Sequence, residues 1–255
     1  MIKNVRHFAV AGCTLLFVGC AEPEKQAVNT QDEATRPDFN VMEDVNQKKQ
    51  SFFTFLRPFV QQENARVSQE RSFLLAIQTQ LKVGQAISPN DLSEARQLGD
   101  AYNRELTGDA VTEPWLDAML LRVDMIPEEL VLSQAANESG WGTSRFAVEG
   151  HNYFGQWCYT QGCGLVPSAR GEGAKHEVAV FSDAAQSVHA YFMNVNRNRA
   201  YAELRDIRAN ERAAGQPVTG VKLAEGLHRY SERGQEYVDE IQGMIRHNKQ
   251  FWQQG

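Results

Sequence analysis

The spacing of apolar residues predicts that the first half of the chain is helical. Large apolar residues recur every seven positions within residues 47–124, which is typical of one long amphipathic helix or of a helix pair. These positions are Phe53, Val60, Val67, Leu74 and Leu81. Pro58 either kinks this helix or lies in its first turn, because proline cannot donate the helical hydrogen bond. Residues 88–91 predict a turn and the start of another helix, which reaches about Leu106.

The pattern of residues in the second half of the chain predicts helices around one small β-hairpin. Pro127 suits the first position of a helix, which the glycines from Gly140 onward end. Residues 177–181 have the composition of a short strand, and the glycines before them indicate a hairpin. Asp183 and Gln186 have the spacing of a capping box that opens the next helix. Further helices are expected at about residues 201–209, 221–227 and 237–252. The predicted fold class is therefore α+β and mainly α.

Composition narrows the classes of function. The chain has 255 residues, of which 42% are hydrophobic, so it can bury a substantial core. Its formal net charge of -6 provides no basic field for a nucleic acid, and we expect no nucleic-acid partner. Phosphate loops, nucleophile elbows and dinucleotide fingerprints are absent from the sequence, and the histidines lack metal-ligand spacing. We therefore expect neither a cofactor nor a metal ion.

The first twenty residues resemble the signal peptide of a bacterial lipoprotein. Lys3 and Arg6 precede an apolar run over residues 8–18 that is too short to span a membrane. The run ends in Phe-Val-Gly-Cys, which is similar to a lipobox except that leucine is usual in place of Phe17, and this marks Cys20 as the lipidated residue. An ordinary secretory signal with an incidental cysteine is the alternative.

The segment after Cys20 is polar and acidic over residues 21–46, which predicts a flexible tether. Ala21, in the position where aspartate would retain a lipoprotein at the inner membrane, implies delivery to the outer membrane. The expected location is therefore the periplasmic face of the cell envelope, with a lipid anchor in the outer membrane.

Two cysteines remain in the exported part of the chain. Cys158 and Cys163 are five residues apart around Gly162, and this spacing can close a small loop. An exported chain meets an oxidising compartment, so the pair predicts a disulfide rather than a zinc site.

Glu138 is a candidate general acid. On a helix that starts near Pro127 it shares one face with Leu130 and Gln134, which places it at the margin of the core on the last turn. The negative end of the helix dipole and shielding by Trp141 both disfavour the ionised carboxyl and raise its pKa. Cleavage of a glycosidic bond requires such a protonated carboxyl. On spacing alone, an exposed glutamate at a helix end is the alternative.

The residues around Glu138 resemble a known glycosidase family. The run Ala-Asn-Glu-Ser-Gly-Trp-Gly at residues 136–142, followed by Asn-Tyr-Phe-Gly at 152–155, closely resembles the glucosaminidase domain of glycoside hydrolase family 73. That family includes flagellar-rod peptidoglycan hydrolases and autolysins, and its domain is lysozyme-like. Residues 156–167, Gln-Trp-Cys-Tyr-Thr-Gln-Gly-Cys-Gly-Leu-Val-Pro, are even more similar to the Bax-type bacterial glucosaminidases. The resemblance covers residues 125–250 well, and we take 125–255 as the glucosaminidase domain.

This resemblance implies an endo-β-N-acetylglucosaminidase that cleaves the glycan strands of peptidoglycan, with Glu138 as general acid. The second catalytic group is left open among Glu172, Glu177 and the 2-acetamido group of the substrate. We favour Glu172, because it lies between two glycines and could reach across a cleft.

Candidate sugar-binding residues surround the same motifs. They are Trp141, Asn152, Phe154, Trp157 and Tyr159. Aromatic rings of this kind stack on pyranose faces, although a core position for Trp157 is equally compatible with the sequence. The segment from Tyr230 to Tyr237 resembles the Tyr-Ala-Thr-Asp-x-x-Tyr motif of the family, but it has one extra residue and lacks the aspartate. We therefore expect Tyr230 to border the active site and Tyr237 to be only a core residue.

Two other functions remain as alternatives. A lytic transglycosylase would use the same acid but leave an anhydro sugar, and a non-catalytic lipoprotein would bind peptidoglycan without cleaving it. The intact run Glu-Ser-Gly-Trp-Gly argues against the second alternative, because a binding module has no need of a shielded acid there.

Overall fold

The computed structural model describes residues 36–168, 170, 173 and 175–252. The predicted signal peptide with Cys20, most of the predicted tether and Glu172 lie outside these residues. From Pro37 onward the chain forms one compact unit. The described residues form mostly helices and one small antiparallel sheet. This confirms the predicted α+β, mainly α fold class.

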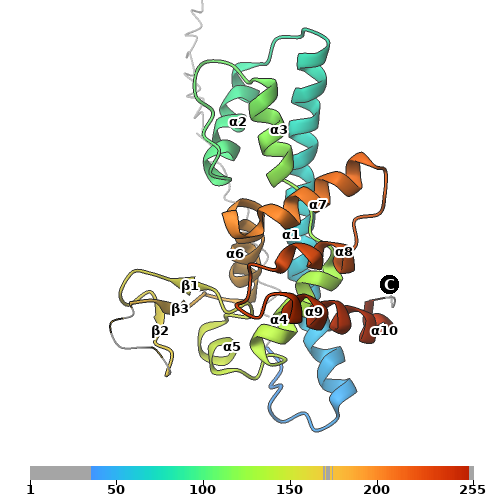
Figure 1. The fold of residues 1–255 in the computed structure, drawn as a ribbon. Coiled ribbons are helices and arrows are strands. Elements are labelled where there is room, and N and C mark those ends of the chain that lie inside the picture. The colour runs from blue at the N-terminus through green and yellow to red at the C-terminus, as the bar shows by residue number, and fades with distance from the viewer. Residues whose placement is uncertain (1–35, 169, 171–172, 174, 253–255) are drawn as a thin grey trace, which may run out of the picture. The chain divides into compact units, whose positions relative to one another are not determined.

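A single long helix, α1 (Val45–Lys82), explains the heptad pattern (Figure 1). Asp44 caps its start by accepting the backbone N–H of Gln47. The residues at the first four heptad positions are buried, and the helix packs against α3, α4 and α6. Pro58 lies inside α1, so the pattern comes from one helix rather than from a pair.

Two shorter helices, α2 (Pro89–Ala101) and α3 (Glu113–Arg122), lie beside one end of α1 (Figure 1). Ser88 caps α2 as predicted, but the helix ends five residues before Leu106. The chain turns away at Asn103, which has a φ of 54°, and the N–H of Arg104 donates back to the carbonyl of Gly99. A Cβ at Gly99 would lie only 2.6 Å from the carbonyl oxygen of Arg104, so the turn requires glycine there. The sequence pattern did not predict α3.

The remaining helices include α4, which carries the candidate acid and packs against α1, α8 and α9. They are α4 (Glu128–Ser139), α5 (Arg145–Gly150), α6 (Ala184–Arg197), α7 (Ala202–Ala213), α8 (Gly220–Ala224), α9 (Gln235–His247) and α10 (Lys249–Trp252), with 3₁₀ turns at Arg199–Tyr201 and Glu225–Leu227. The capping box of α6 is present, because the Asp183 side chain accepts the Gln186 N–H and the Gln186 side chain accepts the Ser182 N–H.

A three-stranded antiparallel sheet extends to one side of these helices (Figure 1). Its strands are β1 (Trp157–Cys158), β2 (Gly164–Leu165) and β3 (Glu177–Ala179), in the order β1-β3-β2. Cys158 is paired with Glu177, and Gly164 with Ala179. A Cβ at Gly164 would lie 2.0 Å from the carbonyl oxygen of Val178, so the strands can approach this closely only because residue 164 is glycine.

One hydrophobic core joins α1 to the helices that follow it. Phe52, Phe53 and Leu56 of α1 are fully buried together with Leu130 and Val131 of α4. The segments that the sequence separates at residue 124 therefore share their core. Among the described residues, no helix combines the length and the apolar character needed to cross a membrane.

Candidate active site

The end of α4 places the Glu138 carboxyl at a cavity. The three residues that follow Ser139 all have positive φ: 56° at Gly140, 60° at Trp141 and 77° at Gly142. A Cβ at Gly142 would lie 2.5 Å from the Phe39 ring, so this position needs glycine for space as well as for conformation. The helix thus stops one residue after Glu138, whose side chain lines a cavity of about 560 Å³.

The Glu138 carboxyl is mostly buried and has a raised pKa. Burial is the largest cause, and the nearby Glu240 carboxylate adds to it. Hydrogen bonds from Tyr237 and Asn137 and the charge of Arg233 act in the opposite direction, yet the net direction is upward. The direction agrees with the prediction from the sequence. The cause differs in part, because Trp141 does not line this cavity.

A chain of hydrogen bonds behind Glu138 holds one of its two oxygens. The Tyr237 hydroxyl donates to Glu138 Oε1 at 2.8 Å and accepts from Gln134 Nε2 at 3.1 Å. The Tyr191 hydroxyl in turn donates to Gln134 Oε1. The other carboxyl oxygen, Oε2, is 3.6 Å from the point where a Cβ on Gly155 would lie, which is an ordinary van der Waals contact. The network thus holds Oε1, and Oε2 lies near Gly155, which also lines the cavity.

Three of the predicted sugar-binding residues line the same cavity. Phe154 is buried and its ring stacks on Tyr191 with a centroid distance of 4.1 Å, whereas Trp157 and Tyr159 are exposed. Trp157 is thus not a core residue, and its ring stacks on His176. The cavity therefore combines a buried aromatic floor with exposed rings at its mouth.

Trp141 lies elsewhere. Its ring packs against Phe52 and Phe53 of α1, and Lys49 Nζ is 5.2 Å from the ring centroid. It lines a second cavity, of about 530 Å³, between α1, α4 and α9. The structure therefore does not bring Trp141 to the cavity that Glu138 lines.

The Asn152 side chain is bonded to the protein backbone. The sequence motif placed it among the sugar-binding residues, but its side chain is buried and bound to the backbone on both ends. Its amide donates to the carbonyls of Gln156 and Ala179, and its oxygen accepts the N–H groups of Phe154 and Gln156. These four bonds use the hydrogen-bonding capacity of the amide, and Asn152 does not line the cavity beside Glu138.

Both tyrosines lie near Glu138, and Tyr237 is the one that binds its carboxyl. Tyr230 lines the cavity as expected, but its hydroxyl donates to the Phe154 carbonyl at 3.0 Å. Tyr237, expected to be only a core residue, contacts the Glu138 carboxyl directly, and its ring stacks on that of Tyr230 at 5.0 Å. The second tyrosine of the family motif was the signal that could have identified it.

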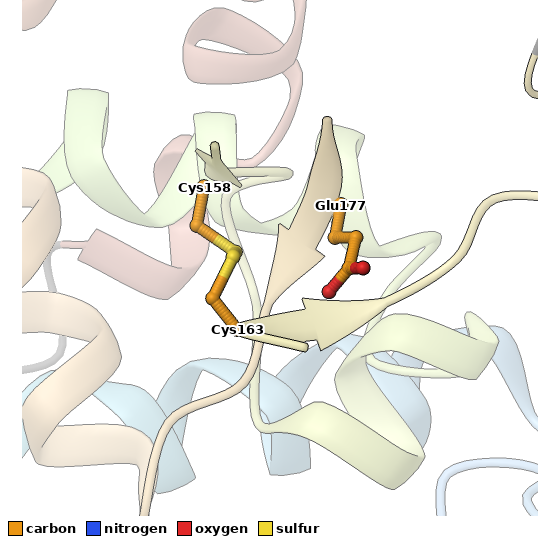
Figure 2. A group of neighbouring side chains, drawn as sticks. All are labelled: Cys158, Cys163 and Glu177. Atoms are coloured by element: carbon orange, nitrogen blue, oxygen red, sulfur yellow. A yellow bond between two sulfur atoms is a disulfide. The ribbon is translucent and has the colours of Figure 1, made fainter. Parts of the chain in front are cut away.

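The predicted disulfide is present. Cys158 and Cys163 are bonded, and the Glu177 carboxylate lies beside them (Figure 2). Possible ligand atoms of these three residues are within 4.8 Å of one another. Since the sulfurs are bonded to each other, they are not thiolates, which is the form that binds a metal ion.

Comparisons with known proteins identify the family of this chain. The family model described as "Glucosaminidase: Mannosyl-glycoprotein endo-beta-N-acetylglucosaminidase" matches residues 115–250, which include α4, the sheet and the cavity. The protein Bax of Escherichia coli (strain K12) is 32% identical over 223 residues, which cover 88% of this chain and 78% of that protein. The chain belongs to the Bax-type glucosaminidase family. No solved structure matches it.

Family membership makes this chain a glycosidase, which normally requires a second catalytic group beside its acid. Glu172, favoured by the sequence, lies outside the described residues. Glu177 is described and is buried on β3, where its two oxygens accept the N–H groups of Gly162 and Gly164. These bonds lower its pKa, so the carboxylate is a weak base.

Polar residues complete the lining of the cavity beside Glu138. They are Gln156, Asn194, Arg197, Asn198, Arg229 and Ser231. None was identified from the sequence as a site residue, because they come from three separate segments that only the fold brings together. Their amide, hydroxyl and guanidinium groups suit a ligand rich in hydroxyl and acetamido groups.

Proposed function

We propose that the chain is an endo-β-N-acetylglucosaminidase of glycoside hydrolase family 73 that cleaves peptidoglycan glycan strands, with Glu138 as the general acid. The observation that carries this proposal is the position of the Glu138 carboxyl. It is mostly buried, its pKa is raised, and it lines a cavity with aromatic and polar walls. A carboxyl in such surroundings holds its proton to higher pH than a solvent-exposed glutamate does and can transfer it to a leaving oxygen.

The proposed reaction starts with a glycan bound across this cavity. Glu138 Oε2 donates its proton to the glycosidic oxygen while the bond between that oxygen and the anomeric carbon breaks. Tyr237 holds Oε1 and so keeps the carboxyl oriented during the transfer. The anomeric carbon is then attacked either by a water molecule, assisted by Glu172, or by the substrate's own 2-acetamido oxygen, with water completing hydrolysis.

Peptidoglycan is the proposed substrate because its glycan contains N-acetylglucosamine and because the sequence carries signals for export. The exposed rings of Trp157 and Tyr159 would stack on the pyranose faces. A mannosyl glycoprotein, named in the family description, offers the same kind of glycosidic bond. The predicted lipoprotein signal favours peptidoglycan of the bacterial cell wall as the substrate over a mannosyl glycoprotein.

The Glu138→Gln variant tests the acid. It keeps the shape of the side chain but removes the proton, so digestion of purified sacculi should slow by about a hundredfold or more. The measurement is the release of soluble muropeptides over time. Glu149→Gln, an exposed glutamate paired with Arg145 on α5, is the matched control and should act as the wild type. A Glu138→Gln enzyme with the wild-type rate would refute the assignment.

Product analysis separates the alternatives. Hydrolysis leaves reducing N-acetylglucosamine ends, whereas a lytic transglycosylase leaves anhydro ends, and mass spectrometry distinguishes them. A non-catalytic wall-binding protein would bind sacculi and release no soluble product.

We also propose that Cys20 carries a lipid that anchors the protein at the periplasmic face of the outer membrane. This rests on the lipobox-like sequence alone. Cys20→Ser should move the protein from the membrane fraction to the soluble periplasmic fraction, as followed by fractionation and immunoblotting. Retention of this variant in the membrane fraction would contradict lipidation.

A further inference from the structure

The loop between β1 and β2 is closed by two separate links. One is the disulfide between Cys158 and Cys163. The other is the carboxylate of Glu177 on β3. Its Oε1 accepts the Gly162 N–H at 3.1 Å and its Oε2 accepts the Gly164 N–H at 2.9 Å. Glu177 is only 5% exposed, and it is paired with Cys158 across the sheet. The carboxylate therefore joins the β2 end of the loop to β3, and the disulfide joins that end to Cys158 on β1.

The two exposed rings of the cavity lie at the start of this loop, with Trp157 on β1 and Tyr159 in the loop itself. Trp157 is 53% exposed and Tyr159 is 78% exposed, so little packing holds either ring in place. Trp157 contacts His176, the residue before Glu177, with a ring distance of 3.8 Å. The direction in which these rings point is set by the backbone of the loop, and that backbone is held by the disulfide and by Glu177.

We infer that Glu177 is a positioning residue for glycan binding, which holds the 158–164 loop so that Trp157 and Tyr159 face the cavity. This inference rests on the proposed function. Each carboxylate oxygen already accepts a backbone N–H, an arrangement in which an ionised acceptor forms strong hydrogen bonds and gains nothing from taking up a proton. The lowered pKa of Glu177 agrees with a group that stays ionised and does not act as the general base.

The Glu177→Gln variant should loosen the loop. Glutamine keeps one acceptor oxygen, but its NH₂ group would face a backbone N–H, so one of the two bonds is lost. Because the rings act in binding, we expect KM for soluble, uncross-linked glycan oligomers to rise by about fivefold while kcat changes by less than about twofold. Amide hydrogen exchange at Gly162 and Gly164 should become faster. Glu149→Gln is the matched control for all of these measurements.

A double-mutant cycle tests whether Glu177 acts through Trp157. Trp157→Ala alone should raise KM, and adding Glu177→Gln to it should raise KM much less than in the wild-type background. Additive effects would overturn the inference. So would a Glu177→Gln enzyme with a lowered kcat, an unchanged KM and a lost acidic limb in its pH profile, because that result is expected of a general base.

A second variant keeps the inference testable if Glu177→Gln does not fold. Cys158→Ser combined with Cys163→Ser removes the other link and should also raise KM with little change in kcat, whereas an unchanged KM would count against the role of the loop. A wild-type protein that neither cleaves nor binds glycan would overturn the proposed function together with the inference. An active wild type whose KM is insensitive to Glu177→Gln would overturn the inference alone.

Discussion

At the scale of single residues, the site depends on how Glu138 is held. The carboxyl loses solvent at the end of α4, which favours its protonated form, while the Tyr237 hydroxyl favours its ionised form. Burial is the stronger effect, so the pKa is raised. Activity that requires the proton is then present at low pH and is lost as the pH rises through the pKa of Glu138.

Tyr237→Phe tests this balance. The variant removes a hydrogen bond that stabilises the ionised carboxyl, so the pKa of Glu138 should rise further and the alkaline limb of the pH–activity profile should move to higher pH. We expect kcat at the optimum to fall by about two- to tenfold, because Oε1 loses the partner that orients it. The measurement is the initial rate on glycan oligomers as a function of pH.

Tyr102→Phe is the matched control for this prediction. Its hydroxyl also donates to a glutamate, Glu70, at 2.6 Å, but this pair joins α2 to α1 and lies outside the cavity. The control should leave the alkaline limb unchanged. A limb that stays in place in Tyr237→Phe as well would show that the hydroxyl does not influence the acid.

At the scale of elements, local signals predicted helix starts better than helix ends. The Asp183–Gln186 capping box and the Ser88 cap are both present, because each cap forms within four residues of sequence. The end of α2 depends instead on a turn between Gly99 and Arg104. This turn packs against Trp115, which lies 11 residues after Arg104 in the sequence. Likewise β1 and β2 have two residues each, too few to show a period, and they are defined only by pairing with β3.

At the scale of the whole molecule, buried arginines join segments that are far apart in the chain. The Arg208 side chain on α7 is 1% exposed and donates to the carbonyls of residues 121, 122, 124 and 125 and to Asn196 Oδ1. Burial lowers the pKa of Arg208 to about 10, so the guanidinium remains charged at neutral pH. The nearby Asp124 carboxylate, which also binds Arg212, balances this charge. The link that leads into α4 is thus held by α7.

Arg208→Met should destabilise the fold without touching the cavity. The substitution keeps much of the apolar length but leaves buried carbonyls without their donor and Asp124 with less compensating charge. We expect the free energy of unfolding to fall by about 3–5 kcal/mol, as for other broken buried ion pairs. Urea unfolding followed by circular dichroism measures it. Arg246→Met, an exposed arginine of α9, is the control and should change stability by less than about 0.5 kcal/mol. Equal stabilities of the two variants would contradict the role of Arg208.

By itself, the sequence determined the features that depend on nearby residues. These are the helical class, the start of α4 and its glycine-stopped end, the candidate acid at that end, and the disulfide between two cysteines five residues apart. Each follows from interactions within about one or two turns of chain, which leave a readable pattern.

Tertiary structure alone decided which groups meet. The fold brings the Tyr237 hydroxyl, 99 residues away in sequence, to the Glu138 carboxyl. It also packs the Trp141 ring against α1 and bonds the Asn152 side chain to the backbone of its own loop. It brings polar groups from three segments into the cavity beside Glu138 and turns both oxygens of Glu177 toward the backbone. Such contacts arise from the packing of elements that are distant in sequence, and the direction of a side chain within that packing has no local signature.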